Sequence, residues 1–500
     1  MMAVSMSEPV VLKRLLAGIA DAPELRVDSL SMDSRHIQGR CLFLALRGEQ
    51  KHGMTFATQA VDAGAVAIVT DLPENDLRVQ TLKRTVPVIC IGTEKHLPAL
   101  IASRFFDAPS ERMNIVAVTG TNGKSSISWL ISAALRELGE SSAVMGTLGS
   151  GRLDALRKQQ LTTPDPVSLQ RRLAELNAEG VGFVALEASS HALVQARLAH
   201  TDIDIAMFSN LTRDHLDYHR DMDAYFEAKA ALFAMPTLSE RIISVDDEYG
   251  RQLFDRYADE AMAVSTAVLA SRPDRFVCVQ GAELSVDQTT LQLSSHRGDV
   301  EIRSSLIGDF NIQNLCLAFA ALLALDVEAM AAAKALGLAS PPPGRMQRVS
   351  SDKPAVFVDF SHTPDALRGA LKTLRQQTVG ALVCVFGCGG ERDRGKRAEM
   401  AQVAEEHADR LVLTSDNPRG EPIDQIFDDM CGGLSREDHV VEPDRRQAIR
   451  AAISQAQADD VVLIAGKGHE AVQNIAGESL PFDDVIEARL AMRHRVGEGA

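Results

Sequence analysis

The fold of this chain is decided by the stretch Ile115-Val116-Ala117-Val118-Thr119-Gly120-Thr121-Asn122-Gly123-Lys124-Ser125-Ser126. Its β-branched beginning predicts a buried parallel strand, and the pattern over 125–138, closed by Gly139, predicts a helix. Between them, glycines let backbone N–H groups turn toward phosphate oxygens, and the helix N-terminus adds its positive end. Lys124 supplies a mobile positive charge, and Ser125 can ligate Mg²⁺. The stretch therefore predicts a loop that holds the phosphates of ATP.

The loop departs in one place from the general nucleotide-binding pattern GxxxxGK[ST]. Val118 stands where that pattern has its first glycine, which weakens the assignment to a generic NTPase. The structural alternative is a glycine-rich turn with a capping serine. The phosphate loop is favoured over that alternative because a strand and a helix flank the motif in the required order.

Around this loop the chain alternates apolar runs with helix-like segments. Buried-strand candidates at 181–186, 203–208 and 241–245 predict a doubly wound parallel sheet. Looser alternation over 284–306 predicts antiparallel strands, and 311–325 predicts a strong helix. Similar alternation before and after this region, with strands expected at 41–46, 65–69, 86–91, 355–360, 381–386, 410–414 and 461–465, predicts further α/β domains.

Chain length and two turn-forming segments predict three domains. At about 150 residues per domain, 500 residues correspond to three domains. Turn formers at 107–110 and the proline run at 340–344 interrupt both helical and strand patterns. The sequence therefore predicts an α/β protein with a central P-loop-type doubly wound parallel sheet at 110–343, an N-terminal α/β domain at 1–109 and a C-terminal Rossmann-like α/β domain at 344–500.

Composition narrows the class of protein. The 52 Lys+Arg against 68 Asp+Glu give a net charge of -16, which disfavours nonspecific binding to nucleic acid or to an anionic membrane. The seven cysteines form no CxxC pair, so we expect reduced core thiols. Lys13 and Arg14 interrupt the apolar segment 10–20, which predicts a short amphipathic surface helix and not a signal peptide. We therefore expect a cytoplasmic protein, and a monomer.

Several motifs, taken together with the phosphate loop, resemble the Mur ligases, the ATP-dependent amide-forming enzymes of peptidoglycan precursor synthesis. They occur in order along the chain at 161–165 (LTTPD), 187–193 (EASSHAL), 210–219 (NLTRDHLDYH), 308–314 (GDFNIQN), 359–365 (DFSHTPD), 387–393 (GCGGERD), 416–419 (DNPR) and 466–470 (GKGHE). The resemblance implies that ATP phosphorylates a carboxylate and that an amine attacks the resulting acyl phosphate.

Within the family, the chain is most similar to members that add the third amino acid of the peptide. The resemblance implies UDP-N-acetylmuramoyl-L-alanyl-D-glutamate as one substrate and, from the 416–419 run, meso-2,6-diaminopimelate as the other. The alternatives are an L-lysine-adding homologue, a folylpolyglutamate-synthetase-like ligase and a non-catalytic, nucleotide-gated binding protein. Retention of the metal and lysine residues described next disfavours the last of these.

The resemblance also implies the ATP and metal sites. ATP is expected on Gly120, Thr121, Asn122, Gly123, Lys124, Ser125, Ser126 and Asn311, and Mg²⁺ on Ser125, Glu187, His215 and a carbamate carried by Lys229. Lys124, Glu187, His215 and Lys229 are the expected catalytic residues. The structural alternatives are a helix cap at Glu187 and Ser189, a strand-end histidine at 215 and a solvated lysine at 229.

Substrate contacts are implied in all three domains. The uridine diphosphate end is expected on Met32, Ser34, Glu49, Gln50 and Lys51, and the muramoyl dipeptide on Thr162, Thr163, Ser189, Gln195 and Arg197. The amino acid is expected on Arg392, Asp416, Asn417, Pro418, Arg419, Gly466 and Glu470. Diaminopimelate has a second amino-acid head, so Arg419 suits its carboxylate and Glu470 its ammonium. The alternative for 416–419 is a simple turn.

Overall fold

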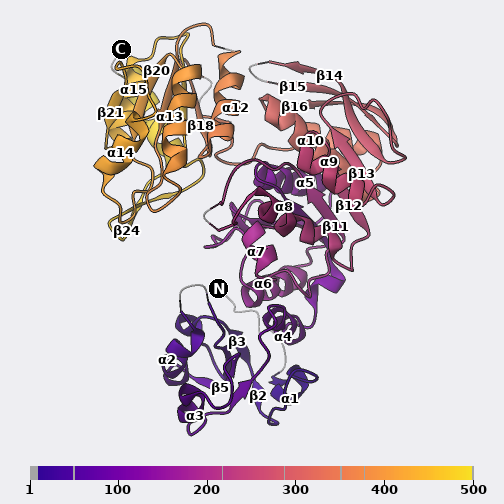
Figure 1. The fold of residues 1–500 in the computed structure, drawn as a ribbon. Helices are drawn as coiled ribbons and strands as arrows, with labels where there is room; N and C mark the ends of the chain where they lie inside the picture. The colour runs from indigo at the N-terminus through magenta and orange to yellow at the C-terminus, as the bar shows by residue number, and fades with distance from the viewer. Residues whose placement is uncertain are drawn as a thin grey trace. The chain divides into compact units, whose positions relative to one another are not determined.

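The computed structural model describes residues 9–48, 51–216, 218–285, 288–349, 352–376 and 378–497 (Figure 1). The chain forms two compact units, one of Met1–Thr119, Glu140–Ala206 and Phe226–Glu240, the other of Gly120–Gly139, Met207–Tyr225 and Arg241–Ala500. The three principal sheets each lie inside one of the three expected domain ranges. The α/β class is confirmed, and the limits near 109 and 343 stay predictions.

The N-terminal sheet is parallel throughout, in the order β3-β4-β5-β6. Its elements are β1 (Val10–Val11), α1 (Leu12–Leu15), β2 (Arg26–Val27), β3 (Ser29–Ser31), β4 (Cys41–Leu44), α2 (Ala57–Asp62), β5 (Ala65–Thr70), α3 (Leu77–Leu82), β6 (Val88–Cys90) and α4 (Leu97–Phe105). Alternate residues of β4 face two cores, because Leu42 and Leu44 join one hydrophobic cluster and Phe43 the other. The expected helix at 10–20 is only one turn long, and it buries Leu12 and Leu15.

The central sheet has ten strands in the order β16-β15-β14-β13-β12-β11-β7-β10-β8-β9. They are β7 (Asn114–Thr119), β8 (Ser142–Gly146), β9 (Gly149–Gly151), β10 (Phe183–Glu187), β11 (Ile205–Phe208), β12 (Glu240–Ser244), β13 (Ala261–Ser265), β14 (Phe276–Leu284), β15 (Thr289–Ser295) and β16 (Gly298–Ser304). Strands β7, β10 and β8 are parallel, as are β12, β13 and β14, whereas β15 and β16 are antiparallel. Both expectations for this region are confirmed.

The helices of the central region are α5 (Lys124–Glu137), α6 (Pro166–Ala178), α7 (Ser190–Val194), α8 (Met222–Ala230), α9 (Glu248–Arg256), α10 (Asp309–Ala324) and α11 (Ala329–Leu338). Helix α5 begins at Lys124, at the end of the phosphate loop, and packs on α10 and α11. Its buried Trp129 donates an indole hydrogen bond of 2.8 Å to the carbonyl of Ser340, at the start of the proline run. This bond ties the helix of the phosphate loop to the segment that leads into the last domain.

The C-terminal sheet has the order β17-β18-β22-β19-β20-β21, parallel from β18 to β21. Its elements are β17 (Gln347–Arg348), β18 (Ala355–Asp359), α12 (Pro364–Arg375), β19 (Leu382–Phe386), α13 (Gly395–His407), β20 (Arg410–Thr414), α14 (Ile423–Cys431), β21 (Val440–Glu442), α15 (Arg445–Gln455), β22 (Val461–Ala465), the hairpin β23 (Val472–Ile475) and β24 (Glu478–Pro481), and α16 (Asp484–Gly497). Helices α12, α13 and α14 pack together, as do α15 and α16 (Figure 1). The strands form two hydrophobic cores, with Phe357 in one and Val356 and Val358 in the other.

The expectation of reduced core thiols is met in part. All seven cysteines are free thiols, but only five are buried, because Cys90 and Cys431 are half-buried near the surface. None of the helices in the described ranges has the length and apolar character needed to cross a membrane.

Candidate active site

The phosphate loop lies where β7 ends, and the backbone of the neighbouring segment 209–212 holds it in place. Gly120 has a φ of 145°, and a Cβ there would collide with Oγ of Ser209. The N–H of Thr121 donates to the carbonyl of Asn210 (2.8 Å), and the N–H of Asn122 to Asn210 Oδ1 (2.9 Å). Only glycine satisfies both the backbone angle and the close approach at position 120.

The charged and hydroxyl groups of the loop occupy the N-terminus of α5. Lys124 Nζ donates to the carbonyls of Gly120 (2.9 Å) and Thr121 (2.8 Å), so the ammonium is held over the loop. Ser125 and Ser126 are buried in the first turn, and Ser125 Oγ accepts a bond of 3.3 Å from Arg345. Glycine-shaped backbone, a helix N-terminus and a lysine together fit a nucleotide phosphate.

Asn311, expected to contact ATP, has a structural role in this conformation. Its side chain is buried, donates to the carbonyl of Ile307 (2.8 Å) and accepts from Asn314 Nδ2 (2.8 Å). These bonds fix the first turn of α10. The structure therefore gives Asn311 a local partner on each side, and its contact with ATP stays a prediction.

Glu187 lies at the carboxyl end of β10, and both oxygens of its carboxylate accept hydrogen bonds from Thr147. Residue 187 pairs in register with Val118, so it stands beside the end of β7 from which the phosphate loop departs. Oε1 accepts from the N–H of Thr147 (2.8 Å), and Oε2 accepts from Thr147 Oγ1 (3.1 Å). The side chain is only 2% exposed. A fixed carboxylate at the switch point of a doubly wound sheet is suited to bind a ligand.

The five residues expected for the muramoyl dipeptide form one cluster, which continues to Glu187 through Thr147. Arg197 donates to Gln195 Oε1 (2.9 and 2.6 Å) and to the carbonyl of Thr163 (2.8 Å). Thr163 Oγ1 donates to the carbonyl of Glu187 (2.6 Å) and lies 3.1 Å from Ser189 Oγ. Thr162 Oγ1 lies 3.2 Å from Thr147 Oγ1. Ser189 also caps α7, as its structural alternative predicts.

The remaining expected metal ligands are placed separately. Lys229 is in the last turn of α8 and is 1% exposed, so the alternative of a solvated lysine is wrong. His215 has a φ of 55° and a half-exposed ring, with Nε2 3.6 Å from Asp214 Oδ2. Burial alone would raise the pKa of Asp214, but the charges of His215, His362 and Lys396 lower it below its ordinary value.

The oxygen atoms of Glu187 and Ser125 are of the kind that binds a Mg²⁺ ion together with phosphate. No group of three or more His, Cys, Asp or Glu side chains is arranged for a metal within the described ranges. Mg²⁺, however, usually binds through one or two carboxylates together with substrate phosphates and water. Glu187 and the hydroxyl of Ser125 are hard oxygen donors of that kind.

The residues expected for the uridine diphosphate end lie in two loops. Ser34 is buried at the start of a single 3₁₀ turn (Ser34–His36) and donates to Gln59 Oε1 (3.1 Å), while Met32 is half-buried just before it. Asp33 caps this turn, and its hydrogen bonds with Arg35 lower the pKa of the carboxyl to about 2. Lys51 is exposed, and its carbonyl accepts from Gly48 (3.1 Å). Glu49 and Gln50 lie outside the described residues.

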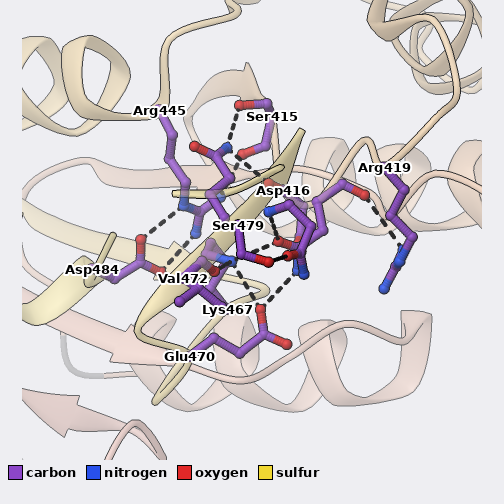
Figure 2. Close-up of polar contacts among 12 residues, drawn as sticks. Ser415, Asp416, Arg419, Arg445, Lys467, Glu470, Val472, Ser479 and Asp484 are labelled. Carbon is purple, nitrogen blue, oxygen red and sulfur yellow. Dashed lines mark hydrogen bonds and ion pairs between the residues drawn. The ribbon is translucent and has the colours of Figure 1, made fainter. Parts of the chain in front are cut away.

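Most of the residues expected for the amino acid lie in the loops that follow β20 and β22, and Figure 2 shows Asp416, Arg419 and Glu470 among them. Asn417 Nδ2 donates to Glu470 Oε2 (2.8 Å), and Arg419 Nη1 donates to the carbonyl of Gly390 (2.7 Å). Gly466 has a φ of 114°, and a Cβ there would come 2.9 Å from Asp416 Oδ2. Pro418 connects Asn417 and Arg419 within the same loop. The expected site is therefore a compact cluster and not an isolated turn.

The charges of this cluster suit a zwitterionic ligand. Arg419 and Arg392 both lie beside Gly389, because a Cβ there would come 3.1 Å from Arg419 Nη1 and 3.6 Å from Arg392 Cγ. Burial, followed by the charge of Arg392, lowers the pKa of Arg419. Burial raises the pKa of Asp416. Burial would also raise the pKa of Glu470, but the charge and hydrogen bond of Lys467 lower it. The guanidinium groups of Arg392 and Arg419 can bind a carboxylate, and the ionised carboxylate of Glu470 can bind an ammonium.

Sequence reasoning missed three residues that hold these sites. Thr147 grips Glu187, and Lys467 bridges Asn417 and Glu470. Arg445, paired with Asp484, donates to the carbonyls of Ser415 (3.3 Å) and Ala465 (2.9 Å), the residues before the two amino-acid loops. Only Lys467 lay within a quoted motif, GKGHE. Nothing local to Thr147 or Arg445 signals their partners.

Family models match three consecutive parts of the chain. The Mur ligase family catalytic domain matches residues 26–102, the Mur ligase middle domain 118–322, and the Mur ligase glutamate ligase domain 344–468. Each match falls within one of the three expected domains.

Relatives match over almost the whole length. A UDP-N-acetylmuramoyl-L-alanyl-D-glutamate--2,6-diaminopimelate ligase of Xanthomonas campestris pv. campestris is 43% identical over 500 residues, 99% of each chain. One from Coxiella burnetii is 41% identical over 94% of this chain and 96% of its own. A solved structure of an enzyme of the same name has a TM-score of 0.67 at 35% identity, covering 98% of this chain and 100% of its own. This chain belongs to the Mur ligase family.

Proposed function

We propose that this protein joins meso-2,6-diaminopimelate to the D-glutamate γ-carboxylate of UDP-N-acetylmuramoyl-L-alanyl-D-glutamate, with ATP as the energy source. The observation that carries this assignment is the cluster of Asn417, Arg419 and Glu470, which presents donors and a carboxylate together. The names of the full-length relatives agree with it.

The chemistry follows from the unreactivity of a carboxylate toward an amine at neutral pH. Attack of the γ-carboxylate on the γ-phosphorus of ATP forms an acyl phosphate and releases ADP. The amine then attacks the acyl carbon, and phosphate leaves with the C–O electron pair. Lys124 and the N–H groups of the loop are placed to stabilise the charge of the transferring phosphoryl group.

The dipeptide is proposed to bind at the cluster of Thr162, Thr163 and Arg197, because it adjoins Glu187 through Thr147. Ser125 and Glu187 are proposed as oxygen ligands of one Mg²⁺, which would neutralise charge between the two anions, and His215 is proposed as a ligand of a second Mg²⁺. We further propose that Lys229 carries a carbamate. Its burial supports this role, because desolvation favours the neutral amine, which is the form of lysine that reacts with CO₂.

The sequence and the structure disfavour three other functions. A lysine-adding enzyme has no need for paired guanidinium groups at the far end of its amino acid, so Arg392 and Arg419 disfavour it. A folylpolyglutamate-synthetase-like ligase is disfavoured by the match of residues 26–102 to a Mur ligase domain. A non-catalytic binding protein would not need a carboxylate at Glu187 fixed by hydrogen bonds, nor a buried lysine at 229.

One assay tests the function. Purified protein is given ATP, Mg²⁺ and UDP-N-acetylmuramoyl-L-alanyl-D-glutamate, and phosphate release is measured with meso-diaminopimelate or with L-lysine. We expect turnover with diaminopimelate to exceed that with lysine by about 10-fold or more, because lysine leaves Arg419 without its anion. Equal or faster turnover with lysine would refute the specificity.

We also propose that the protein acts as a monomer with no nucleic-acid or membrane partner. The net charge of -16 supports the second part of this proposal. Light scattering of the purified protein at working concentration tests the first part, and a mass of two chains would refute it.

A further inference from the structure

Lys467 is a buried lysine for which the proposed substrate contacts do not account. Its side chain is 0% exposed and lies between two residues proposed to bind the amino acid (Figure 2). Nζ donates to Asn417 Oδ1 (3.1 Å), to Glu470 Oε2 (2.8 Å) and to the carbonyl of Val472 (2.8 Å). An ammonium group has three N–H donors, so these bonds use all of them.

The first consequence concerns the amide of Asn417. Its Oδ1 accepts from Lys467 Nζ and also from the N–H of Asn474 (2.9 Å). Because two donors face this oxygen, reversing the amide would set its NH₂ group against both of them. Nδ2 must therefore point toward Glu470, where one of its hydrogens is used. Among the residues that the structure describes, Nδ2 makes no second hydrogen bond, so its other hydrogen is left to donate to a ligand.

The second consequence concerns the carboxylate of Glu470. Oε2 accepts from both Lys467 and Asn417, which fixes the rotation of the carboxylate. Among the described residues none donates a hydrogen bond to Oε1, and Figure 2 shows this second oxygen directed away from the two donors. The side chain is 33% exposed, so Oε1 is open to a ligand.

We infer that Lys467 is a positioning residue for the distal head of the amino acid. It presents an N–H of Asn417 to a carboxylate and Oε1 of Glu470 to an ammonium. The inference rests on the proposed function. It assigns Lys467 a role in recognising the amino acid, without contact with the substrate or with the reacting atoms.

Electrostatics support this role. Burial would raise the pKa of Glu470, but the charge of Lys467 and its hydrogen bond lower it below the ordinary value. The charged or titratable groups that face Glu470 are Lys467, His469, Asp416, Arg419 and Arg445. Lys467 is the nearest cation among these described groups, bonded to the carboxylate itself. It keeps Glu470 ionised, which acceptance from an ammonium requires.

The test is Lys467→Met, which keeps an unbranched side chain one atom shorter than that of lysine and removes the charge and the donors. We expect the KM for diaminopimelate to rise about 10- to 100-fold, while kcat and the KM values for ATP and the UDP-dipeptide change less than about threefold. The acid limb of kcat/KM for diaminopimelate should move to higher pH, because the pKa of Glu470 rises when the cation is lost. Lys467→Arg should keep the limb in place.

The matched control is Lys353→Met, because Lys353 is an exposed lysine of the same domain and pairs with Asp459 (2.7 Å). It should leave every kinetic parameter unchanged. If Lys467→Met does not fold, Lys467→Gln takes its place, and failure of both to fold would assign Lys467 to stability and overturn the inference. An unchanged KM and acid limb in a folded variant would also overturn it. Wild-type protein inactive with diaminopimelate would instead refute the proposed function, and this inference with it.

Discussion

The phosphate loop and the amino-acid cluster are held in different ways. The N–H groups of the loop at 120–126 donate to the carbonyl and to the side-chain oxygen of Asn210, and Gly120 leaves room for Ser209. The amino-acid cluster is fixed by the side chains of Lys467 and Arg445, both buried cations. The conformation of the loop is encoded by a continuous run of glycine-rich sequence, although its partner Asn210 lies 88 positions from Asn122. A site held by buried charge depends on residues distant along the chain.

The largest effect expected from this comparison is at Gly120. Gly120→Ala would place a Cβ against Ser209 Oγ, which is itself bonded to the carbonyl of Asn122 (2.6 Å). We expect ATP-dependent turnover to fall about 1000-fold, comparable to losing a main electrostatic contact in the transition state. Gly139→Ala, at the other end of α5, is the control, because its φ of 87° is also positive but nothing lies within 4 Å. It should lower thermal stability and leave kcat unchanged.

Lys229 extends the comparison with the buried cations of the amino-acid cluster. It is also a buried lysine, but the carbamate proposed on it would make it an anion. Lys229→Ala should lower kcat about 100-fold or more, the scale of a lost electrostatic contact. Added short carboxylates should restore part of the activity by occupying the place of the carbamate. Lys158→Ala, an exposed lysine, should be unaffected. Turnover like that of wild type in Lys229→Ala would remove the residue from the mechanism.

Arg419 tests the charged cluster directly. Arg419→Met removes one of two neighbouring guanidinium groups and keeps a side chain with a Cβ at a φ of 54°. A lost charged hydrogen bond of about 1.5–3 kcal/mol corresponds to a KM for diaminopimelate raised about 10- to 100-fold. The preference for diaminopimelate over lysine should shrink accordingly. Arg489→Met, on the exposed side of α16, is the control. An undiminished preference in Arg419→Met would show that the amino acid is recognised elsewhere.

Substitution of Thr147 should give the smallest effect, because one of its two hydrogen bonds to Glu187 comes from the backbone. Thr147→Val removes the hydroxyl bond and keeps the N–H bond. We expect kcat to fall about 10-fold, and the Mg²⁺ concentration for half-maximal rate to rise, because the lost hydroxyl bond contributes about 1–2 kcal/mol. Thr147→Ser should restore both values. Identical Mg²⁺ dependence in Thr147→Val and wild type would contradict the role of Thr147 in holding Glu187.

The same contrast explains what could be predicted from the sequence. The phosphate loop, the strand before it and the helix after it occupy adjacent positions, so local pattern was sufficient. Glu187 and Thr163 were found through motifs, and the structure brings them together. Thr147 lies 40 positions from Glu187, and Lys467 lies 50 positions from Asn417. Which strand ends become neighbours depends on sheet order, and no local pattern specifies that order.

The short strands of the last domain could not be predicted from the sequence either. The hairpin of β23 and β24 has mixed polar and apolar residues and little burial, so neither strand shows a clear alternation. Yet the N–H of Arg419 donates to the carbonyl of Asn474 (2.9 Å), and the N–H of Asn474 donates to Asn417. A segment that looks like a loop in the sequence therefore supports the amino-acid cluster.

The bond from Trp129 to Ser340 has a practical consequence, because the chain contains a single tryptophan. That indole is buried on the helix that begins with Lys124, and its N–H ends on the segment leading into the last domain. Its fluorescence therefore comes from one known place. Breaking or lengthening that bond would shift the emission of an otherwise unlabelled protein, so the chain carries its own optical reporter for that junction.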